Sequence, residues 1–95
     1  MAALFVIDLT VKNADKLKEY SAQTPAILKK HNGEVLLKGK ASHVHATTPG
    51  TPYDTTVVFQ FPSKEDAMGW YNSPEYQALL PLRDEAMDST FKLVA

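Results

Sequence analysis

The side chains best suited to hold a ligand in this sequence are adjacent aromatic residues and a single arginine. Trp70 and Tyr71 are neighbours, and Arg83 is the one arginine among the ten basic residues. Aromatic rings with one polar tip can enclose an organic molecule, and a guanidinium pairs bidentately with a carboxylate. Lysine would serve equally well for surface solubility, so an arginine favours a partner that needs a planar fork. These three residues predict binding of a small organic anion.

Two further side chains have the chemistry to transfer a proton to such a ligand, the phenol of Tyr20 and the imidazole of His31. A structural interpretation stands beside the functional one. Tyr20 and Trp70 fall on the apolar stripes of their expected helices, where core packing is common. Arg83 precedes Asp84 and can simply pair with a nearby acid.

The spacing of two histidines is compatible with a metal site. His43 and His45 lie two residues apart, so a strand would place both imidazoles on one face, with His31 or Asp8 as a third ligand. The sequence fixes no third ligand, and two strand histidines beside a Pro/Gly-rich segment are the simpler interpretation. There is also no Cys-x-x-Cys-His motif for haem attachment. We therefore predict no metal and no cofactor.

Several classes of chemistry are excluded by what the sequence lacks. The absence of cysteine removes disulfides, thiolate nucleophiles and iron-sulfur clusters. No Gly-x-Ser-x-Gly or Gly-x-Gly arrangement is present, so hydrolase and nucleotide chemistry are not expected. Ten Lys and Arg against eleven Asp and Glu give a formal charge of −1, which disfavours nucleic acid and anionic membranes as partners.

Length and composition bound the architecture that must position these residues. Ninety-five residues, 44% hydrophobic and 22% charged, predict one globular domain over residues 1–95. The first residues lack a positive region and carry an acid after a short apolar run. We therefore expect neither a signal peptide nor a spanning helix, and a cytoplasmic location is the default.

Apolar periodicity and turn residues predict a strand, a helix, two strands, a helical region and a final strand. These are a strand over 4–11, an amphipathic helix from 13 to 33, one long strand or two short ones over 34–46, a hairpin turn within 47–52, a strand over 53–61, a helix from 63 that restarts at 73, and a strand over 90–95. This order is the split-βαβ, ferredoxin-like plan of the α+β class, an antiparallel sheet with helices on one face.

Local residues predict how these elements begin and where they deform. Asn13, Ser63 and Ser73 are suited to cap the amino ends of helices, since a short polar side chain can accept a hydrogen bond from an amide of the first turn. Pro25 removes one amide from the first helix and predicts a kink or break there. Gly39 predicts a β-bulge in the strand around it.

The sheet is predicted to bury both of its faces. Residues 4–11 and 53–61 carry apolar side chains on both sides, yet the helices can cover only one side. The simplest cover for a chain of this size is a second copy, sheet against sheet about a two-fold axis. We therefore expect a homodimer.

Several stretches of the sequence resemble one known family, the uncharacterised family catalogued as domain of unknown function 1330. They are residues 18–20, Gly33, residues 38–39, 57–63, the run Trp-Tyr-Asn-Ser-Pro-Glu-Tyr-Gln at 70–77, and 81–83. The resemblance covers nearly the whole chain and implies a dimeric α/β barrel of two ferredoxin-like subunits. Distant members of that superfamily include cofactor-free monooxygenases, haem-degrading enzymes, muconolactone-isomerase-like enzymes and chlorite dismutases, but the family itself implies no activity.

The resemblance also implies that both helical regions lie against the same sheet face, near the mouth of the barrel. It would thereby gather the aromatic and proton-transfer candidates, which are Tyr20, His31, Trp70, Tyr71, Tyr76 and Arg83. Two functions remain open. One is a dimer that binds or converts a small organic anion in a cleft between sheet and helices. The alternative is a non-catalytic dimeric accessory or stress-linked module whose aromatic residues are core.

Overall fold

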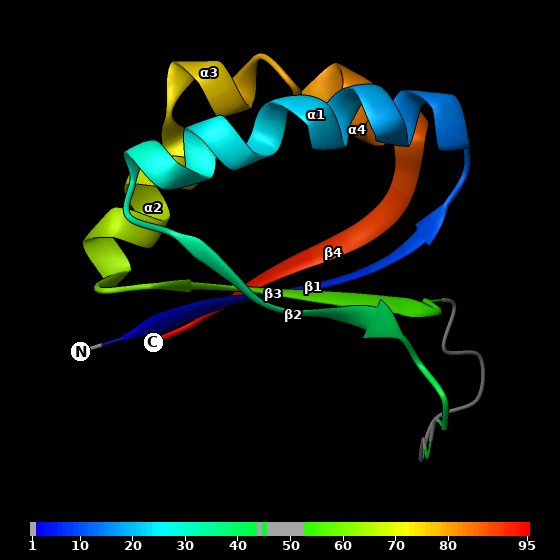
Figure 1. Cartoon of the computed structure of the whole chain (residues 1–95), viewed down its shortest axis with the longest axis horizontal. Helices are drawn as coiled ribbons and strands as arrows, with labels where there is room; N and C mark the ends of the chain where they lie inside the picture. Colours follow the sequence, from blue (N-terminus) through cyan, green and yellow to red (C-terminus); the bar gives the residue numbers. More distant parts are fainter. Residues whose placement is uncertain (1, 44, 46–52) are drawn as a thin grey trace.

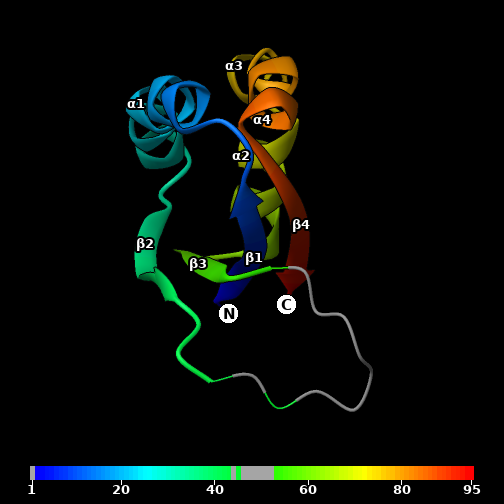
Figure 2. The same cartoon turned by 90° about the vertical axis from the view of Figure 1, so that its right-hand side faces the viewer.

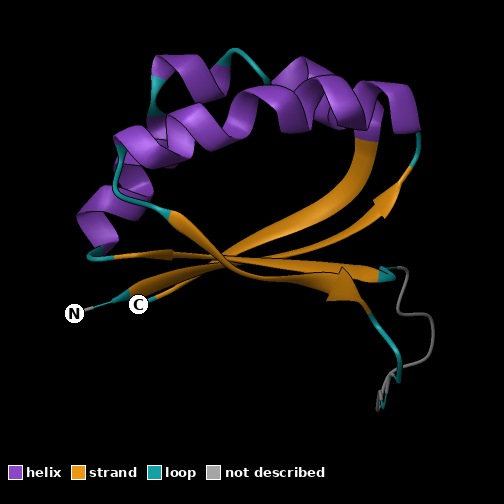
Figure 3. Cartoon of the chain, in the orientation of Figure 1, coloured by secondary structure: helices purple, strands orange, loops and turns teal. Residues whose placement is uncertain are grey.

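The chain folds as a four-stranded sheet with all of its helices on one side. The computed structural model describes residues 2–43, 45 and 53–95. Its elements, in order, are β1 (Ala3–Val11), α1 (Ala14–Lys30), β2 (Glu34–Lys40), β3 (Thr55–Phe61), α2 (Lys64–Asn72), α3 (Pro74–Gln77), α4 (Leu80–Ala86) and β4 (Met87–Val94). The strands are antiparallel in the order β2-β3-β1-β4 (Figures 1 and 3). This confirms the predicted α+β, ferredoxin-like arrangement.

The helices form two neighbouring columns above the sheet. Figure 2 shows α1 on the β2 side and α2, α3 and α4 on the β4 side. The second helical region is thus divided into three short helices, since Ser73 caps a new start and Pro81 lies in the first turn of α4. The predicted hairpin pairs β2 with β3, whereas its predicted turn at 47–52 lies outside the described residues.

The three predicted N-caps are confirmed, each by a side-chain oxygen that accepts from an amide of the first turn. The pairs are Asn13 Oδ1 with the Lys16 amide at 3.1 Å, Ser63 Oγ with the Asp66 amide at 3.1 Å, and Ser73 Oγ with the Tyr76 amide at 3.2 Å. These bonds satisfy amides that have no partner within the helix. Short-range polar residues therefore set where the helices begin.

The end of α1 depends on two adjacent residues. Asn32 adopts a left-handed conformation with φ of 62°, which turns the chain out of the helix. The Gly33 amide then donates to the Leu28 carbonyl at 2.9 Å. A β-carbon at Gly33 would lie 2.6 Å from the Phe61 ring, so only glycine allows this close approach.

The structure corrects two local predictions. Of the kink or break predicted at Pro25, the break is wrong, because α1 continues through Pro25. Pro25 leaves the Ser21 carbonyl without its helical amide, and both residues are exposed, so water can bond that carbonyl. The bulge of β2 lies at Leu36 rather than at Gly39, because the register shifts between Val35 and Leu37. Leu36 is on an exposed edge strand, where an additional residue disturbs no packed neighbour.

The last strand begins earlier than predicted. β4 starts at Met87, three residues before Thr90, because Met87 pairs with Val11 and Asp88 with Thr10 of β1. Met87 is also buried in the core. Long-range pairing and burial therefore extend a strand that its own residues mark weakly.

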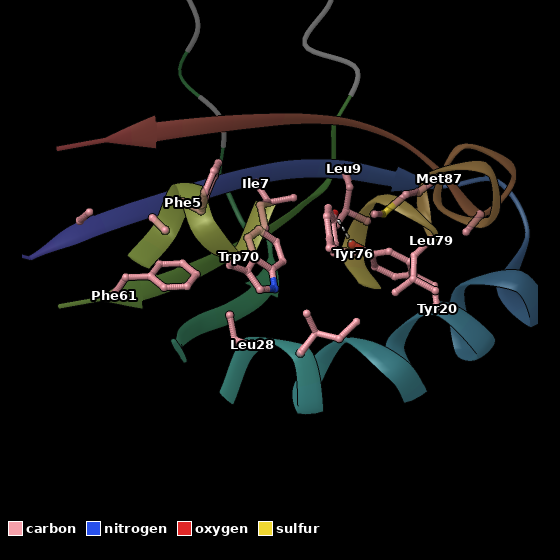
Figure 4. Close-up of a cluster of buried hydrophobic side chains, with 14 residues drawn as sticks. Phe5, Ile7, Leu9, Tyr20, Leu28, Phe61, Trp70, Tyr76, Leu79 and Met87 are labelled. Atoms are coloured by element: carbon pink, nitrogen blue, oxygen red, sulfur yellow. Dashed lines mark hydrogen bonds between the residues drawn. The ribbon is translucent and has the colours of Figure 1, made fainter. Parts of the chain in front are cut away.

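The hydrophobic core lies between the helices and one face of the sheet (Figure 4). On β1, Phe5, Ile7 and Leu9 point into it, and Phe61, Trp70 and Tyr76 are its largest fully buried side chains. The opposite face of the sheet carries an apolar strip on all four strands, consisting of Leu4, Val6, Leu37, Val58 and Val94, which we call the open-face strip. In the described part of the chain no helix covers it.

Candidate functional site

A cleft of about 560 Å³ lies between α1 and the helix-covered face of the sheet. Its walls are mostly apolar, with Ile7 and Leu9 from β1, Val57 and Phe59 from β3 and Phe91 from β4. The volume is in the range of sites that hold small organic molecules. The predicted cleft between sheet and helices is therefore present, and α1 forms one of its walls.

The charged groups that line this cleft are Lys38 and Lys40 of β2. Both are exposed, whereas Ile7 and Leu9 opposite are buried, so the positive charge lies at the rim. No acidic side chain lines the cleft within the described residues, and neither lysine forms an ion pair there. The rim can therefore attract an anionic group without competition from a neighbouring carboxylate.

The bulge at Leu36 brings these lysines to the cleft. Lys38 pairs with Val57 and Lys40 with Thr55, and both partners on β3 face the helices. Side chains alternate along a strand, so one additional residue exchanges the two faces beyond it. Without the bulge, the lysines would point to the other side of the sheet.

Hydroxyl groups from α1 complete the cleft. Tyr20, Ser21 and Thr24 contribute to its wall, and Tyr20 and Thr24 are buried. Residues four apart lie on the same face of a helix, so Tyr20 and Thr24 both face the sheet. The cleft thus combines an apolar surface with polar groups on one wall and cations at the rim.

Beneath α2, α3 and α4 the same sheet face is filled by rings. Trp70 is fully buried and lies 4.3 Å from the Tyr76 ring, 5.4 Å from Phe5 and 5.4 Å from Phe59, measured between centroids. Among the described residues, its Nε1 has no hydrogen-bond partner, so Trp70 contributes packing rather than a polar contact. Figure 4 shows Trp70 and Tyr76 in the interior. Trp70 does not line the cleft.

Arg83 is engaged by neighbouring rings. Its Nη1 donates to the Tyr71 hydroxyl at 3.1 Å and to the Tyr76 hydroxyl at 3.3 Å, and its guanidinium carbon lies 4.7 Å from the Phe91 ring centroid. Its Nε is 3.6 Å from Asp84, which is within ion-pair range. Burial alone would lower the pKa of Arg83, but the hydrogen bonds to the tyrosines outweigh it and raise that pKa. The guanidinium stays charged.

A chain of hydroxyl groups leads from Arg83 to the cleft. The Tyr76 and Tyr20 hydroxyls are 2.7 Å apart (Figure 4), and Tyr20 lines the cleft. Burial raises the pKa of Tyr20, and Tyr76 adds to the rise. Burial also raises the pKa of Tyr76, against the opposing effect of its hydrogen bonds with Tyr20 and Arg83. Both phenols are therefore neutral at physiological pH.

The structure separates the residues singled out from the sequence. It brings Tyr20, Tyr71, Tyr76 and Arg83 into one hydrogen-bonded group, with Trp70 packed beside it. Of the six candidates, only Tyr20 lines the cleft.

The candidate histidines do not line the cleft. His31 caps the end of α1, and its Nδ1 would be 3.5 Å from a β-carbon placed at Gly69. The rings of His43 and His45 stack with centroids 6.5 Å apart. Within residues 2–43, 45 and 53–95, no three acidic, histidine or cysteine side chains are grouped to hold a metal.

Lys38 and Lys40 were missed by reasoning from the sequence. Their i, i+2 spacing on a predicted strand could have marked them as neighbours on one face. The bulge at Leu36 decides which face of the sheet the two lysines lie on. A leucine is not a residue type that predicts a bulge.

Comparisons with solved structures agree with the fold. A protein of unknown function from Rhodopseudomonas palustris matches with a TM-score of 0.81 at 13% identity, over 98% of this chain and 80% of that chain. A dimeric ferredoxin-like protein of unknown function from Jannaschia sp. CCS1 matches with a TM-score of 0.70 at 10% identity, over 100% and 99% of the two chains. SnoaB, a cofactor-independent oxygenase from Streptomyces nogalater, matches with a TM-score of 0.66 at 14% identity, over 99% and 91%. These likenesses concern the fold alone.

Among the described residues, no helix has the length and apolar character needed to span a membrane.

Sequence comparison identifies the family. No curated protein matches the chain significantly. The model of the family described as domain of unknown function (DUF1330) matches residues 2–95. Because that match covers almost the full length, the chain belongs to the DUF1330 family.

Proposed function

We propose that this protein binds a small, mostly apolar organic anion in the cleft between α1 and the sheet. The observation that carries the proposal is a cleft of about 560 Å³ with apolar walls, in which the charged lining groups among the described residues are both lysines. Apolar burial supplies most of the affinity in such a site, and a few polar groups orient the ligand. The binding function predicted from the sequence is kept, with a different set of contacts.

The anion partners in this proposal are Lys38 and Lys40. Arg83 is half-buried and donates to Tyr71 and Tyr76, so a ligand would have to displace hydrogen bonds to reach it. Trp70 and Tyr71 support the cleft from behind, because Phe59 and Phe91 pack against them and line it.

The experiment measures binding of 2-naphthoate by isothermal titration calorimetry, with neutral 2-naphthamide as its comparison. Ser21→Phe introduces a ring into the cleft wall, while Ala22→Phe places the same ring on the next, exposed residue of α1, which does not line the cleft. We expect Ser21→Phe to weaken naphthoate binding by about tenfold or more, a loss of about 1.4 kcal/mol, and Ala22→Phe to leave it within about twofold.

A second pair of variants tests the charge. Replacing both Lys38 and Lys40 by Gln removes two rim cations, whereas Lys29→Gln removes an exposed cation of α1 outside the cleft. The double variant should lose its preference for naphthoate over naphthamide, and Lys29→Gln should keep it. No binding by the wild-type protein, or equal losses in Ser21→Phe and Ala22→Phe, would refute the cleft as the site.

We also propose that two copies associate through the open-face strip. Val6 faces Val58 across β1 and β3, and Leu4 faces Val94 across β1 and β4, so apolar side chains of different strands adjoin. Val94 is 48% exposed and Leu37 58%. Structural neighbours from Jannaschia sp. CCS1 and Thermobifida fusca are described as dimeric ferredoxin-like proteins, which supports a dimer for this chain as well.

Val58→Asp tests the dimer because both cross-strand neighbours of Val58, Val6 and Leu37, are apolar, so the variant would bury an unpaired carboxylate at the interface, at a cost of several kcal/mol. Light scattering should give about twice the 10.5 kDa chain mass for the wild type and the chain mass for Val58→Asp. Ala22→Asp, on the exposed side of α1, should remain dimeric. A wild-type protein that is monomeric at micromolar concentration would contradict this assembly.

A further inference from the structure

Tyr20 is the residue that joins the cleft to the buried hydrogen-bonded group. Tyr20 lines the cleft, and its hydroxyl lies 2.7 Å from that of Tyr76. Tyr76 in turn accepts from Arg83 Nη1 at 3.3 Å. The three groups form a series in which a charged guanidinium lies at one end and the open cleft at the other.

The direction of this series follows from what each group can donate. A guanidinium has no acceptor, so Tyr76 must accept from Arg83. In the described part of the chain the Tyr76 hydroxyl has two hydrogen-bond neighbours, Arg83 and Tyr20. Its own proton therefore has one acceptor there, the Tyr20 oxygen. If Tyr20 donated instead, the proton of the fully buried Tyr76 would lack a partner, which is costly.

This arrangement leaves the hydroxyl proton of Tyr20 without an acceptor among the described residues, and Tyr20 lines the cleft. Arg83 also makes Tyr76 a stronger donor, because a nearby positive charge and its hydrogen bond favour release of the phenol proton. Polarisation passes along linked hydrogen bonds, so Tyr20 becomes a stronger donor as well. Since burial keeps Tyr20 neutral, it acts as a donor rather than as a base.

We propose that Tyr20 donates a hydrogen bond to a carbonyl oxygen of the ligand, and that Tyr76 and Arg83 are positioning residues which direct and polarise this donor. The ligand class is then an apolar organic acid that carries a ketone, quinone or similar carbonyl at the end away from its carboxylate. The carboxylate meets Lys38 and Lys40 at the rim, and the carbonyl reaches the buried wall at Tyr20. This inference rests on the proposed binding function and specifies its ligand.

The experiment uses two probes of the same shape, 6-acetyl-2-naphthoate and 6-isopropenyl-2-naphthoate, which differ by the carbonyl oxygen. Calorimetry measures the affinity of each for the wild type, Tyr20→Phe, Tyr76→Phe and Tyr53→Phe. Tyr53 is a control because its hydroxyl accepts from Thr90 and it does not line the cleft. We expect Tyr20→Phe to weaken the acetyl probe about fivefold and the isopropenyl probe by less than about twofold.

Infrared spectroscopy of the bound acetyl probe supplies a measurement that a purely structural role would not change. A hydrogen bond lowers the carbonyl stretching frequency relative to the same probe in hydrocarbon. We expect a lowered frequency in the wild type and in Tyr53→Phe, a smaller shift in Tyr76→Phe, and no shift in Tyr20→Phe.

Three outcomes would overturn this inference. One is a hydrocarbon-like carbonyl frequency in the wild-type complex, which needs no variant to interpret. Another is an equal loss for both probes in Tyr20→Phe. In both of these cases the probes still bind, so the proposed function stands while the role of Tyr20 falls. If neither probe binds the wild type, the proposed function fails, and this inference fails with it.

Discussion

The helix-covered face of the sheet has two halves that are packed in different ways. Under α2, α3 and α4, rings from helices and strands contact one another, and Phe61, Trp70 and Tyr76 are fully buried. Under α1, the helix contributes Tyr20, Ser21 and Thr24, and a cleft of about 560 Å³ remains. Short hydroxyl side chains and flexible lysines do not fill the space that interlocking rings fill.

This contrast shows how a ligand-binding pattern and a core pattern can share residue types. The run around Trp70 has the rings and the polar tips of a binding cage, but its rings lie 4.3 to 6.5 Å from neighbouring rings. Such edge and tilted contacts stabilise a core by about 0.5–1.5 kcal/mol each beyond the apolar burial. The hollow half, with fewer rings, is where the structure leaves room for a ligand.

The largest difference between the halves should appear when side chains are removed. Trp70→Ala should lower the free energy of unfolding by about 3–5 kcal/mol, because it leaves a cavity among packed rings. Val57→Ala should cost about 1 kcal/mol or less, since Val57 is half-buried and borders the cleft. Urea unfolding at a fixed protein concentration measures both. Equal losses would mean that the cleft is as tightly packed as the ring cluster.

Enlarging a side chain should also destabilise the ring-filled half more than the half that contains the cleft. Ala67 of α2 is fully buried, so Ala67→Leu should destabilise the protein by about 1–3 kcal/mol through overpacking. Val57→Leu adds one methylene beside open space and should change stability by less than about 0.5 kcal/mol. Thermal unfolding distinguishes them, and a Val57→Leu variant as unstable as Ala67→Leu would contradict a hollow half.

Substituting Arg83 should lower stability without weakening ligand binding, in contrast to substituting the rim lysines. Arg83→Lys should cost about 1–2 kcal/mol of stability, because an ammonium cannot keep the planar contacts to Tyr71, Tyr76 and Phe91. Its affinity for 2-naphthoate should stay within about twofold of the wild type. Weaker binding in Arg83→Lys with unchanged stability would restore Arg83 as the direct partner of the anion.

The smallest effect concerns the link between the halves, where Lys30 of α1 lies 3.4 Å from Glu75 of α3. A backbone hydrogen bond at Glu75 and the bond from Lys30 hold the pKa of this carboxyl below its usual range. Its contribution is therefore present above the ordinary glutamate pKa and is lost as pH falls through the lowered value. Glu75→Gln should flatten the pH dependence of the unfolding midpoint below about pH 5. An unchanged pH profile would show that the link is too exposed to matter.

Residues close together in the sequence determined the elements and their order. Asn13, Ser63 and Ser73 mark helix starts because each cap bonds to an amide three residues away, so no distant part of the chain is needed. Successive side chains of a strand point to opposite faces, so the nearly continuous apolar run of β1 likewise predicts a strand that is apolar on both faces. These local patterns suffice for the α+β, ferredoxin-like plan and for the expectation of a second copy on the open face.

Tertiary structure decided which residues surround the cleft. The bulge at Leu36 decides which face of the sheet Lys38 and Lys40 lie on. This bulge depends on how β2 pairs with β3, which the residues of β2 alone do not predict. Whether Trp70 encloses a ligand or other rings depends on volumes contributed by residues as distant as Phe5 and Phe91. Packing is a property of the assembled volume, so a pattern that names the rings cannot say whether the space between them is full.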